Sequence, residues 1–209
     1  MRRLGSLSLK EIEAMNRVAS DAMATVMEAA EGRMTVPMDD LELFVRHTPG
    51  KRMLDVGCGP ARYVEEFMSR GFEYTGIDFS EPIVGLARAR HPRLNFHVMS
   101  YRELNFVDES FDGLWSCCVL YHEPKRNVQA VLREWRRVLV PAGALVVVLP
   151  DQQTSYEHIG ETFTTGLPSY FSYWELDELA EEMTRAGFSV VEQFPRYDWG
   201  SMTLIGLRI

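Results

Sequence analysis

The sequence has few cysteines and no long apolar run, and both shortages limit what the protein can be. Its three cysteines, Cys58, Cys117 and Cys118, include an adjacent pair and form no Cys-x-x-Cys motif. A disulfide framework and a cysteine-ligated zinc site are therefore not expected, and we expect a reduced, cytoplasmic protein. No apolar run approaches the roughly 20 residues of a membrane span. No apolar segment follows the first three residues, so neither a membrane anchor nor a signal peptide is expected.

Positive charge is also scarce, because 22 Lys and Arg face 30 Asp and Glu, for a net charge of -8. Proteins that bind DNA or RNA gather basic side chains against the phosphates, so a nucleic-acid partner is not expected. The local cluster Arg133, Arg136 and Arg137 is typical of a solvated helix face. The acidic pairs Asp39-Asp40 and Asp108-Glu109 are typical of caps and turns, and no metal site is expected.

From about residue 50 the chain alternates between predicted strands and helices. Strands are predicted at 52–56, 73–77, 94–99, 112–119 and 143–149, and helices at 60–70, 81–90 and 126–139. Leu94, Phe96 and Val98 are expected on one face of the third strand. Strand–helix alternation at this spacing predicts an α/β fold, a doubly wound parallel sheet with helices on both faces.

The two ends of the chain depart from this alternation. Residues 1–48 are predicted to be helical, opened by a Ser8-x-x-Glu11 capping box, and are expected to form a lid over residues 49–150. Residues 151–173, rich in Ser, Thr, Gly and aromatics, are predicted as an irregular insertion on the substrate side. Residues 174–209 are predicted as a helix closed by Gly187 and a hairpin of strands at about 188–194 and 202–208. The whole of 1–209 is expected to be one domain.

A glycine loop and a later aspartate point to a ligand. Leu54–Gly59 (LDVGCG) lies where the first strand turns into the first helix, and its glycines let a ligand approach the backbone. A dinucleotide loop would need a third glycine, and Asp55 would repel a pyrophosphate, so a cationic ligand fits better. Asp78 ends the second strand about 20 residues on and can accept both ribose hydroxyls of an adenosine. The alternatives are a plain strand-to-helix turn and a helix cap.

Together these motifs resemble the class I, Rossmann-like S-adenosylmethionine-dependent methyltransferases, in particular the type 11-like small-molecule enzymes. Leu54–Gly59 is similar to the first motif and Gly76–Asp78 to the second. Residues 108–122 resemble the surroundings of the fourth strand, 132–143 the fourth helix and following turn, and 187–188 the junction before the sixth strand. The resemblance covers roughly residues 50–150, and 174–209 more weakly. It implies a three-layer fold with helices on both sides of a seven-stranded sheet. The strands are mostly parallel, and the last one is antiparallel.

The resemblance also implies a set of residues that bind S-adenosyl-L-methionine and its product S-adenosyl-L-homocysteine. Backbone near Gly57 would hold the methionine part, Asp78 the ribose, and Phe79 would pack on adenine. Ser100 stands where many members have an acid that accepts from the adenine amino group, and Ala61 stands where many have glycine. The complete set is Asp55, Gly57, Cys58, Gly59, Asp78, Phe79, Ser100, Tyr101, Ser116 and Cys117.

His122, just past the fourth strand, is the candidate general base, because an unperturbed histidine titrates near pH 6.5. The alternative is that it only lines the pocket beside Tyr121. The aromatic residues of the insertion are expected to recognise the acceptor, or alternatively to cover the sheet edge as core. The candidates for substrate binding are Tyr121, Tyr156, Tyr170 and Trp174.

The function predicted from these features is in-line methyl transfer to a small-molecule acceptor. Three alternatives stay open: a methyltransferase that acts on RNA or protein, a nicotinamide-dependent oxidoreductase, and a catalytically silent protein that binds S-adenosylmethionine as a regulator. The acceptor and its reacting atom, the pathway and the oligomeric state do not follow from these residues.

Overall fold

A computed structural model of the 209-residue chain describes residues 6–29, 38–196 and 200–209. The expectation that the chain has no signal peptide rests partly on its first three residues. These residues lie outside the described ranges. Helix α1 (Leu9–Ala29) begins at the predicted capping box, where Ser8 Oγ accepts from Glu11 N–H at 3.2 Å and Glu11 Oε2 accepts from Ser8 N–H at 2.8 Å. Helix α2 (Met38–His47) follows. No helix among the described residues is both long and apolar enough to cross a bilayer.

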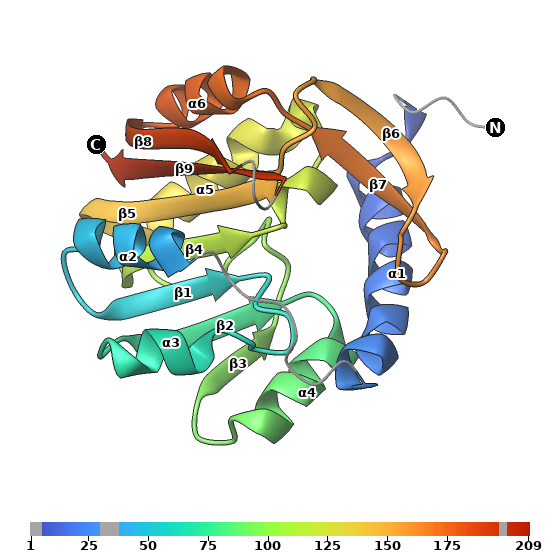
Figure 1. The fold of residues 1–209 in the computed structure, drawn as a ribbon, viewed down its shortest axis with the longest axis horizontal. Helices are drawn as coiled ribbons and strands as arrows, with labels where there is room; N and C mark the ends of the chain where they lie inside the picture. Colours follow the sequence, from blue (N-terminus) through green and yellow to red (C-terminus); the bar gives the residue numbers. More distant parts are fainter. Residues whose placement is uncertain (1–5, 30–37, 197–199) are drawn as a thin grey trace.

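The centre of the protein is a seven-stranded sheet in the order β3-β2-β1-β4-β5-β9-β8 (Figure 1). Strands β1 to β5 run parallel, whereas β9 pairs antiparallel with both β5 and β8. The prediction of a seven-stranded, mostly parallel sheet with an antiparallel last strand is therefore confirmed. The strands are β1 (Arg52–Val56), β2 (Glu73–Asp78), β3 (Asn95–Val98), β4 (Phe111–Cys117), β5 (Leu139–Pro150), β8 (Phe188–Arg196) and β9 (Ser201–Arg208).

Helices cover both faces of the sheet and enclose two apolar cores. Helices α2, α3 (Val64–Ser69) and α4 (Glu81–Arg90) lie on one face, where Phe44 and Phe67 each meet Trp115 edge to face. Helices α5 (Val128–Val138) and α6 (Leu176–Arg185) lie on the other. Helix α5 packs inward because its apolar side chains recur at spacings of three and four, which is one helical face. These are Val128, Val131, Leu132, Trp135 and Val138, all fully buried.

The structure corrects the prediction for the insertion. Strands β6 (Tyr156–Glu161) and β7 (Pro168–Tyr173) form a separate two-stranded antiparallel sheet, called the hairpin below, in register from Tyr156 opposite Tyr173 to Glu161 opposite Pro168. The sequence does not reveal these strands, because they are short and include Gly160 and Pro168, residue types that are depleted in strands.

One smaller prediction was also wrong. The helix expected at 60–70 begins only at Val64, because Gly57, Gly59 and Ala61 hold positive φ angles of 71°, 55° and 59°, which are not helical. Phe96 and Val98, expected on one face of the third strand, differ in burial: Phe96 is buried, whereas Val98 ends the edge strand β3 and is 41% exposed.

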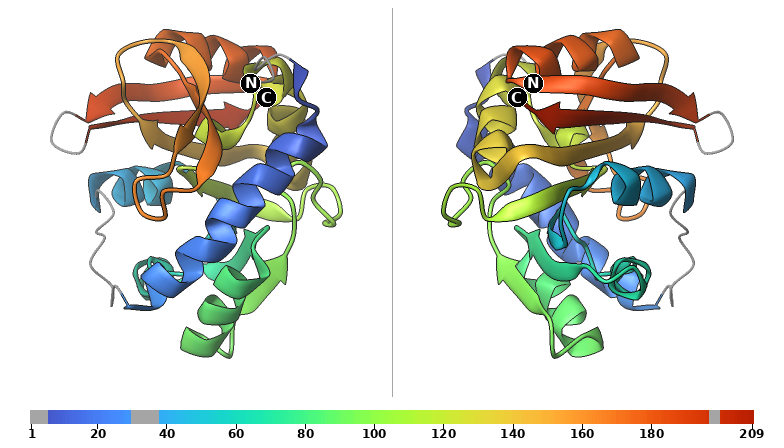
Figure 2. Two further views of the ribbon diagram at one scale, coloured as in Figure 1. Left: turned by 90° about the vertical axis from the view of Figure 1, so that its right-hand side faces the viewer. Right: turned by 90° about the vertical axis from the view of Figure 1, so that its left-hand side faces the viewer.

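Helix α1 and the hairpin lie together across the carboxyl ends of the parallel strands (Figures 1 and 2). Asn16 of α1, almost fully buried, joins three elements. Its Oδ1 accepts from Ser169 Oγ and from the Tyr170 N–H, both at 2.8 Å, and its Nδ2 donates to the His122 carbonyl at 3.1 Å. His122 ends the short 3-10 helix η2 (Leu120–His122). In an open α/β sheet this carboxyl edge is where ligands bind.

Candidate active site

A cavity of about 350 Å³, called the glycine-loop cavity, lies at the carboxyl ends of β1, β2 and β4, beneath α1. Its floor includes Gly57 and Gly59, which follow β1, and Asp78, which ends β2. Its other walls come from the segments after β3 and β4 and from α1. The lining residues not yet named are Ser20, Met23, Met27, Ile77, Phe79, Ile83, Met99, Tyr101, Cys117, Cys118, Val119, Tyr121, His122 and Thr164.

The two glycines serve different purposes. Both hold left-handed backbone, with φ of 71° at Gly57 and 55° at Gly59. A Cβ on Gly57 would lie 2.3 Å from Val119 Cγ2, so this glycine is required by packing within the protein. A Cβ on Gly59 would meet no atom within 4 Å and would stand in the cavity. Gly59 therefore leaves room for a ligand to approach the backbone.

We expect alanine at these two positions to separate stability from ligand binding. Gly59→Ala costs the left-handed strain of about 1–2 kcal/mol, and Gly57→Ala costs more, because the overlap with Val119 adds to that strain. Thermal melting of both variants tests the order of stability. S-adenosylhomocysteine titration should show at least tenfold weaker binding for Gly59→Ala. Equal melting temperatures, or undiminished binding by Gly59→Ala, would contradict this assignment.

Asp78 is placed as a hydrogen-bond acceptor at the cavity floor. Its Oδ2 accepts from the Gly59 N–H at 3.2 Å, and its Oδ1 accepts from the Ser80 N–H at 2.9 Å. Each carboxylate oxygen has a second acceptor site, so the group can still bind two hydroxyls. Burial raises the pKa of Asp78 to about 6, and backbone N–H donors at Ser80, Gly59 and Phe79 oppose that rise. The carboxyl is therefore ionised at neutral pH.

The other residues predicted to bind the cofactor divide into two groups. Phe79, Tyr101 and Cys117 line the glycine-loop cavity, and the Arg17 guanidinium lies 5.2 Å above the Phe79 ring. Four others, Asp55, Cys58, Ser100 and Ser116, are not among its lining residues.

The position of two of these four has a clear cause. Asp55 is buried and accepts a hydrogen bond from the Tyr74 hydroxyl, and its burial raises its pKa to about 7. Ser100 Oγ instead donates to Glu13 Oε2 of α1 at 3.3 Å. Both side chains are thus occupied by partners within the protein.

Helix α1, part of the expected lid, supplies one wall of the site. Ser20, Met23 and Met27 all line the glycine-loop cavity. Their spacings of three and four place them on one face of the helix. Of the three, Ser20 was not expected there. Val119 and Cys118 were also missed, although they directly follow the predicted Cys117.

A second cavity of about 330 Å³, called the hairpin cavity, adjoins the first between α1 and the hairpin. The two share five lining residues: Ser20, Met23, Tyr121, His122 and Thr164. The remaining walls are Asn16 and Ala19 of α1 and the hairpin side chains His158, Glu161, Thr162, Phe163, Ser169, Phe171 and Tyr173. A ligand in either cavity would therefore contact Tyr121 and His122.

Of the four aromatic residues predicted to bind substrate, only Tyr121 lines a cavity. Tyr170 is fully buried, and its hydroxyl donates to Glu157 Oε1 at 2.6 Å. It points away from the cavity because alternate residues of a strand face opposite sides, and Phe171 takes the cavity side. Trp174 is buried in the core beneath Lys125, and Tyr156 is exposed at the far end of the hairpin. The structure does not bring these three residues to either cavity.

His122 lies in the wall between the cavities. Its Nδ1 is 2.9 Å from the Tyr170 carbonyl oxygen, which can only accept, so Nδ1 carries the proton and Nε2 is left as an acceptor. Burial lowers the pKa of His122 to about 4. The expectation of an ordinary value near 6.5 was therefore wrong, because the sequence does not reveal burial. At neutral pH this imidazole is uncharged.

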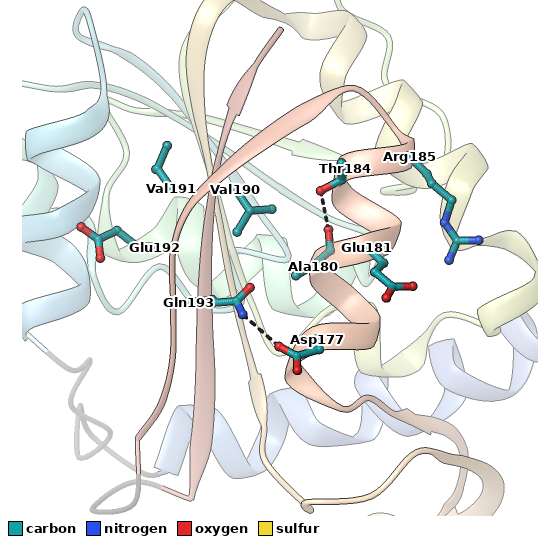
Figure 3. Close-up of a pocket in the computed structure, with 9 residues that line it drawn as sticks. All are labelled: Asp177, Ala180, Glu181, Thr184, Arg185, Val190, Val191, Glu192 and Gln193. Atoms are coloured by element: carbon teal, nitrogen blue, oxygen red, sulfur yellow. Dashed lines mark hydrogen bonds between the residues drawn. The ribbon is translucent and has the colours of Figure 1, made fainter.

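A third hollow, of about 680 Å³, lies away from this region, between α6 and the edge strand β8 (Figure 3). The hydrogen bonds drawn there join parts of its own walls, such as Gln193 Nε2 to Asp177 Oδ1 at 3.0 Å. It shares no lining residue with the other two cavities. Among the residues that the structure describes, no group of three His, Cys, Asp or Glu side chains is arranged to hold a metal ion.

The strand order, the glycine loop and the position of Asp78 at the cavity floor are those of an α/β protein with a ligand site at the carboxyl edge of its sheet. Residues 54–147 match the family model described as a methyltransferase domain. Over these 94 of its 209 residues, the chain is similar to methyltransferases that use S-adenosylmethionine.

Three relatives illustrate the similarity. The 27-O-demethylrifamycin SV methyltransferase of Amycolatopsis mediterranei is 29% identical over 196 residues, which are 86% of this chain and 70% of that protein. The probable tRNA methyltransferase 9B of Bos taurus is 32% identical over 114 residues, 53% of this chain and 24% of that protein. The structure of the Burkholderia thailandensis 1,6-didemethyltoxoflavin-N1-methyltransferase superposes with a TM-score of 0.74 at 19% identity, covering 100% of this chain and 92% of that one.

The similarity has limits. The matched part spans only 24% to 41% of the length of the first three curated relatives. At 19% identity, the likeness to the solved structure shows the fold alone.

Proposed function

We propose that the protein transfers a methyl group from S-adenosylmethionine to a small molecule held in the hairpin cavity. The observation that carries this proposal is the pair of adjoining cavities with a common wall at Tyr121 and His122. One cavity has the glycine loop and Asp78, and the other is lined mainly by aromatic and small polar side chains. Methyl transfer needs two ligands whose reacting atoms meet in line, and this arrangement supports such a meeting.

The residues of the glycine-loop cavity fit S-adenosylmethionine. The free acceptor sites of Asp78 suit the two ribose hydroxyls, and the open space beside Gly59 admits a chain close to the backbone. Phe79 and Met99 offer apolar walls for a base. When bound, the sulfonium supplies a methyl group to a nucleophile and leaves as a neutral thioether.

The protein's own contribution is to position the acceptor and handle one proton. Helix α1 and the hairpin lie across the carboxyl edge of the sheet (Figure 2); α1 supplies side chains to the walls of both cavities and the hairpin to those of the second. His122 Nε2 can accept a hydrogen bond from the acceptor's nucleophilic group. An oxygen or nitrogen that is gaining a methyl group becomes strongly acidic, so even a base whose pKa is about 4 can take its proton late in the transfer.

A small acceptor is favoured over RNA by size and charge. The hairpin cavity is at the lower end of the range of about 300–1,000 Å³ typical of ligand pockets. Among the described residues that line the two cavities, none is Lys or Arg, whereas RNA binding requires cations near phosphates. The names of the relatives include small-molecule enzymes and a probable tRNA methyltransferase, so both acceptor classes belong in the test.

The test has two stages. Calorimetric titration with S-adenosylhomocysteine and, separately, NADH should show micromolar binding of the first only. The protein is then incubated with S-adenosylmethionine radiolabelled in its methyl group and with low-mass metabolites, total tRNA or total protein of its source. Label in the low-mass fraction is the expected result. Label only in tRNA or protein would overturn the proposed acceptor, and a preference for NADH would overturn the reaction itself.

His122→Asn tests the proton acceptor within the same assay. Asparagine keeps an N–H donor near the Tyr170 carbonyl but removes the Nε2 acceptor. We expect the turnover number to fall by roughly 100-fold, while S-adenosylhomocysteine affinity stays within about threefold of the wild type. Unchanged turnover would show that His122 only lines the cavity.

A further inference from the structure

We propose that the acceptor is an uncharged, planar aromatic molecule that stacks against the hairpin and presents a hydroxyl or ring N–H to His122. This inference rests on the proposed function and specifies the ligand of the hairpin cavity. The aromatic side chains of that cavity, their polar neighbours and the exposed tip of the hairpin each support it.

The aromatic rings on the cavity face of the hairpin are nearly parallel. His158 stacks on Phe171 at 5.4 Å between centroids with 27° between planes, and on Tyr173 at 5.7 Å with 13°. Tyr121 continues the series, 5.6 Å from Phe171 with 36° between planes. Aromatic pairs prefer offset stacking at such separations. A flat ring can join this series as a further member, whereas a puckered ring meets the same surface with fewer contacts.

The polar groups of the cavity are few and suit an uncharged ligand. His122 is neutral, and Glu161, at the exposed end of β6, is the one carboxylate among the lining residues described. No described lining residue is Lys or Arg, so a carboxylate or phosphate on the ligand would find no cation there. His158 Nδ1 is buried without a hydrogen-bond partner among the described residues. A single polar substituent on the ligand would satisfy it.

The tip of the hairpin carries an aromatic side chain that nothing in the described structure covers. Phe163 lines the hairpin cavity, yet its side chain is fully exposed. A ligand in the cavity would remove part of this apolar surface from water, which is favourable by about 25 cal/mol per Å². Phe163 therefore adds a second apolar surface for the ligand, at the mouth of the cavity.

The transfer step balances for such an acceptor. The bond between the methyl carbon and the sulfonium sulfur breaks, and its electron pair stays on sulfur. A new bond forms between that carbon and the oxygen or nitrogen of the acceptor. The proton from the acceptor's O–H or N–H moves to His122 Nε2 and then to solvent.

The experiment compares three probes on protein saturated with S-adenosylhomocysteine. 2-Naphthol is flat and neutral, decahydro-2-naphthol has the same framework and hydroxyl but is puckered, and 2-naphthoate is flat but anionic. We expect 2-naphthol to bind at least tenfold more tightly than either of the others, measured by calorimetry. Equal or weaker binding of 2-naphthol, or no measurable binding, would overturn the inference.

Two variants locate the binding. Phe171→Leu removes the central ring while keeping an apolar side chain, and should weaken 2-naphthol binding about tenfold. Phe194→Leu removes an aromatic ring on β8, which lines neither cavity, and should leave binding unchanged. S-adenosylhomocysteine binding by each variant reports that it is folded. If the wild type fails to bind S-adenosylhomocysteine, the proposed function fails; if it binds but does not favour 2-naphthol, only the aromatic acceptor fails.

Discussion

Replacement of Asp78 by alanine is expected to weaken S-adenosylhomocysteine binding by at least 100-fold in a calorimetric titration. The carboxylate lies at the cavity floor with one free acceptor site on each oxygen. Hydrogen bonds to a charged group contribute about 1.5–3 kcal/mol each, so two lost ribose contacts amount to about 3–6 kcal/mol. A hundredfold change in the dissociation constant is about 2.7 kcal/mol, which lies just below that range.

A neighbouring carboxylate offers a matched control. Asp21 of α1 accepts a hydrogen bond from Ser80 Oγ at 2.6 Å, but it is not among the residues that line the cavity. Asp21→Asn should therefore change the affinity by less than about threefold. Binding by Asp78→Ala within tenfold of the wild type would show that the ribose is held elsewhere.

The pH dependence of binding identifies the same group. Burial raises the pKa of Asp78 to about 6. Ribose hydroxyls donate to the ionised form, so a proton on Asp78 must be released before binding. The affinity should be constant above pH 7 and fall by up to about tenfold per unit below pH 6. Asp78→Asn should abolish this fall; a midpoint near pH 7 instead would point to Asp55, whose pKa burial raises to about 7.

The part of the site that the sequence predicts is the part set by local backbone. Gly57 and Gly59 are needed because a left-handed turn follows β1, and Asp78 reaches the cavity because it ends the neighbouring strand. Both features depend on a few consecutive residues and on the rule that ligands bind at the carboxyl edge. The parallel sheet was predicted from the alternation of strands and helices, and the antiparallel last strand was expected only from the resemblance.

The hairpin cavity could not be predicted, because it is made by contacts between distant segments. Asn16 joins α1 to Ser169 and Tyr170, more than 150 residues later, as well as to the carbonyl of His122. The sequence shows neither this contact nor the burial that lowers the pKa of His122. It also gives no sign that Glu13 would take the hydroxyl of Ser100. Contacts between side chains that are distant in the sequence decide which of the predicted residues can reach a ligand.

The largest expected effect on stability is at Arg102. Its Nε donates to Glu123 Oε2 at 2.7 Å, and its Nη1 donates to Glu13 Oε2 at 3.0 Å and to the Leu9 carbonyl at 3.1 Å. Glu123 is fully buried, and its remaining partners, the Tyr101 hydroxyl and the Asn127 amide, are neutral. Arg102→Ala would leave that carboxylate buried without a cation.

Removing one partner of a buried ion pair costs about 3–5 kcal/mol. For a chain of this length, we expect Arg102→Ala to lower the melting temperature by roughly 6–20 °C. Arg70→Ala is the matched control, because Arg70 pairs with Glu42 and Glu66, whose side chains are 57% and 46% exposed. Exposed pairs contribute about 0–1 kcal/mol, so the unfolding free energy of Arg70→Ala should be close to that of the wild type.

A double substitution separates two contributions to the lost stability: the buried carboxylate left without a cation, and the contacts that Arg102 no longer makes. In Arg102→Ala combined with Glu123→Gln, no buried carboxylate remains without a cation, while the amide can still bond to Tyr101 and Asn127. The double variant should therefore be more stable than Arg102→Ala alone, by at least about 1 kcal/mol in denaturant unfolding. If it is equally unstable, the cost of Arg102→Ala comes from the lost contacts to Leu9 and Glu13, and Arg102 serves mainly to fasten α1 over the site.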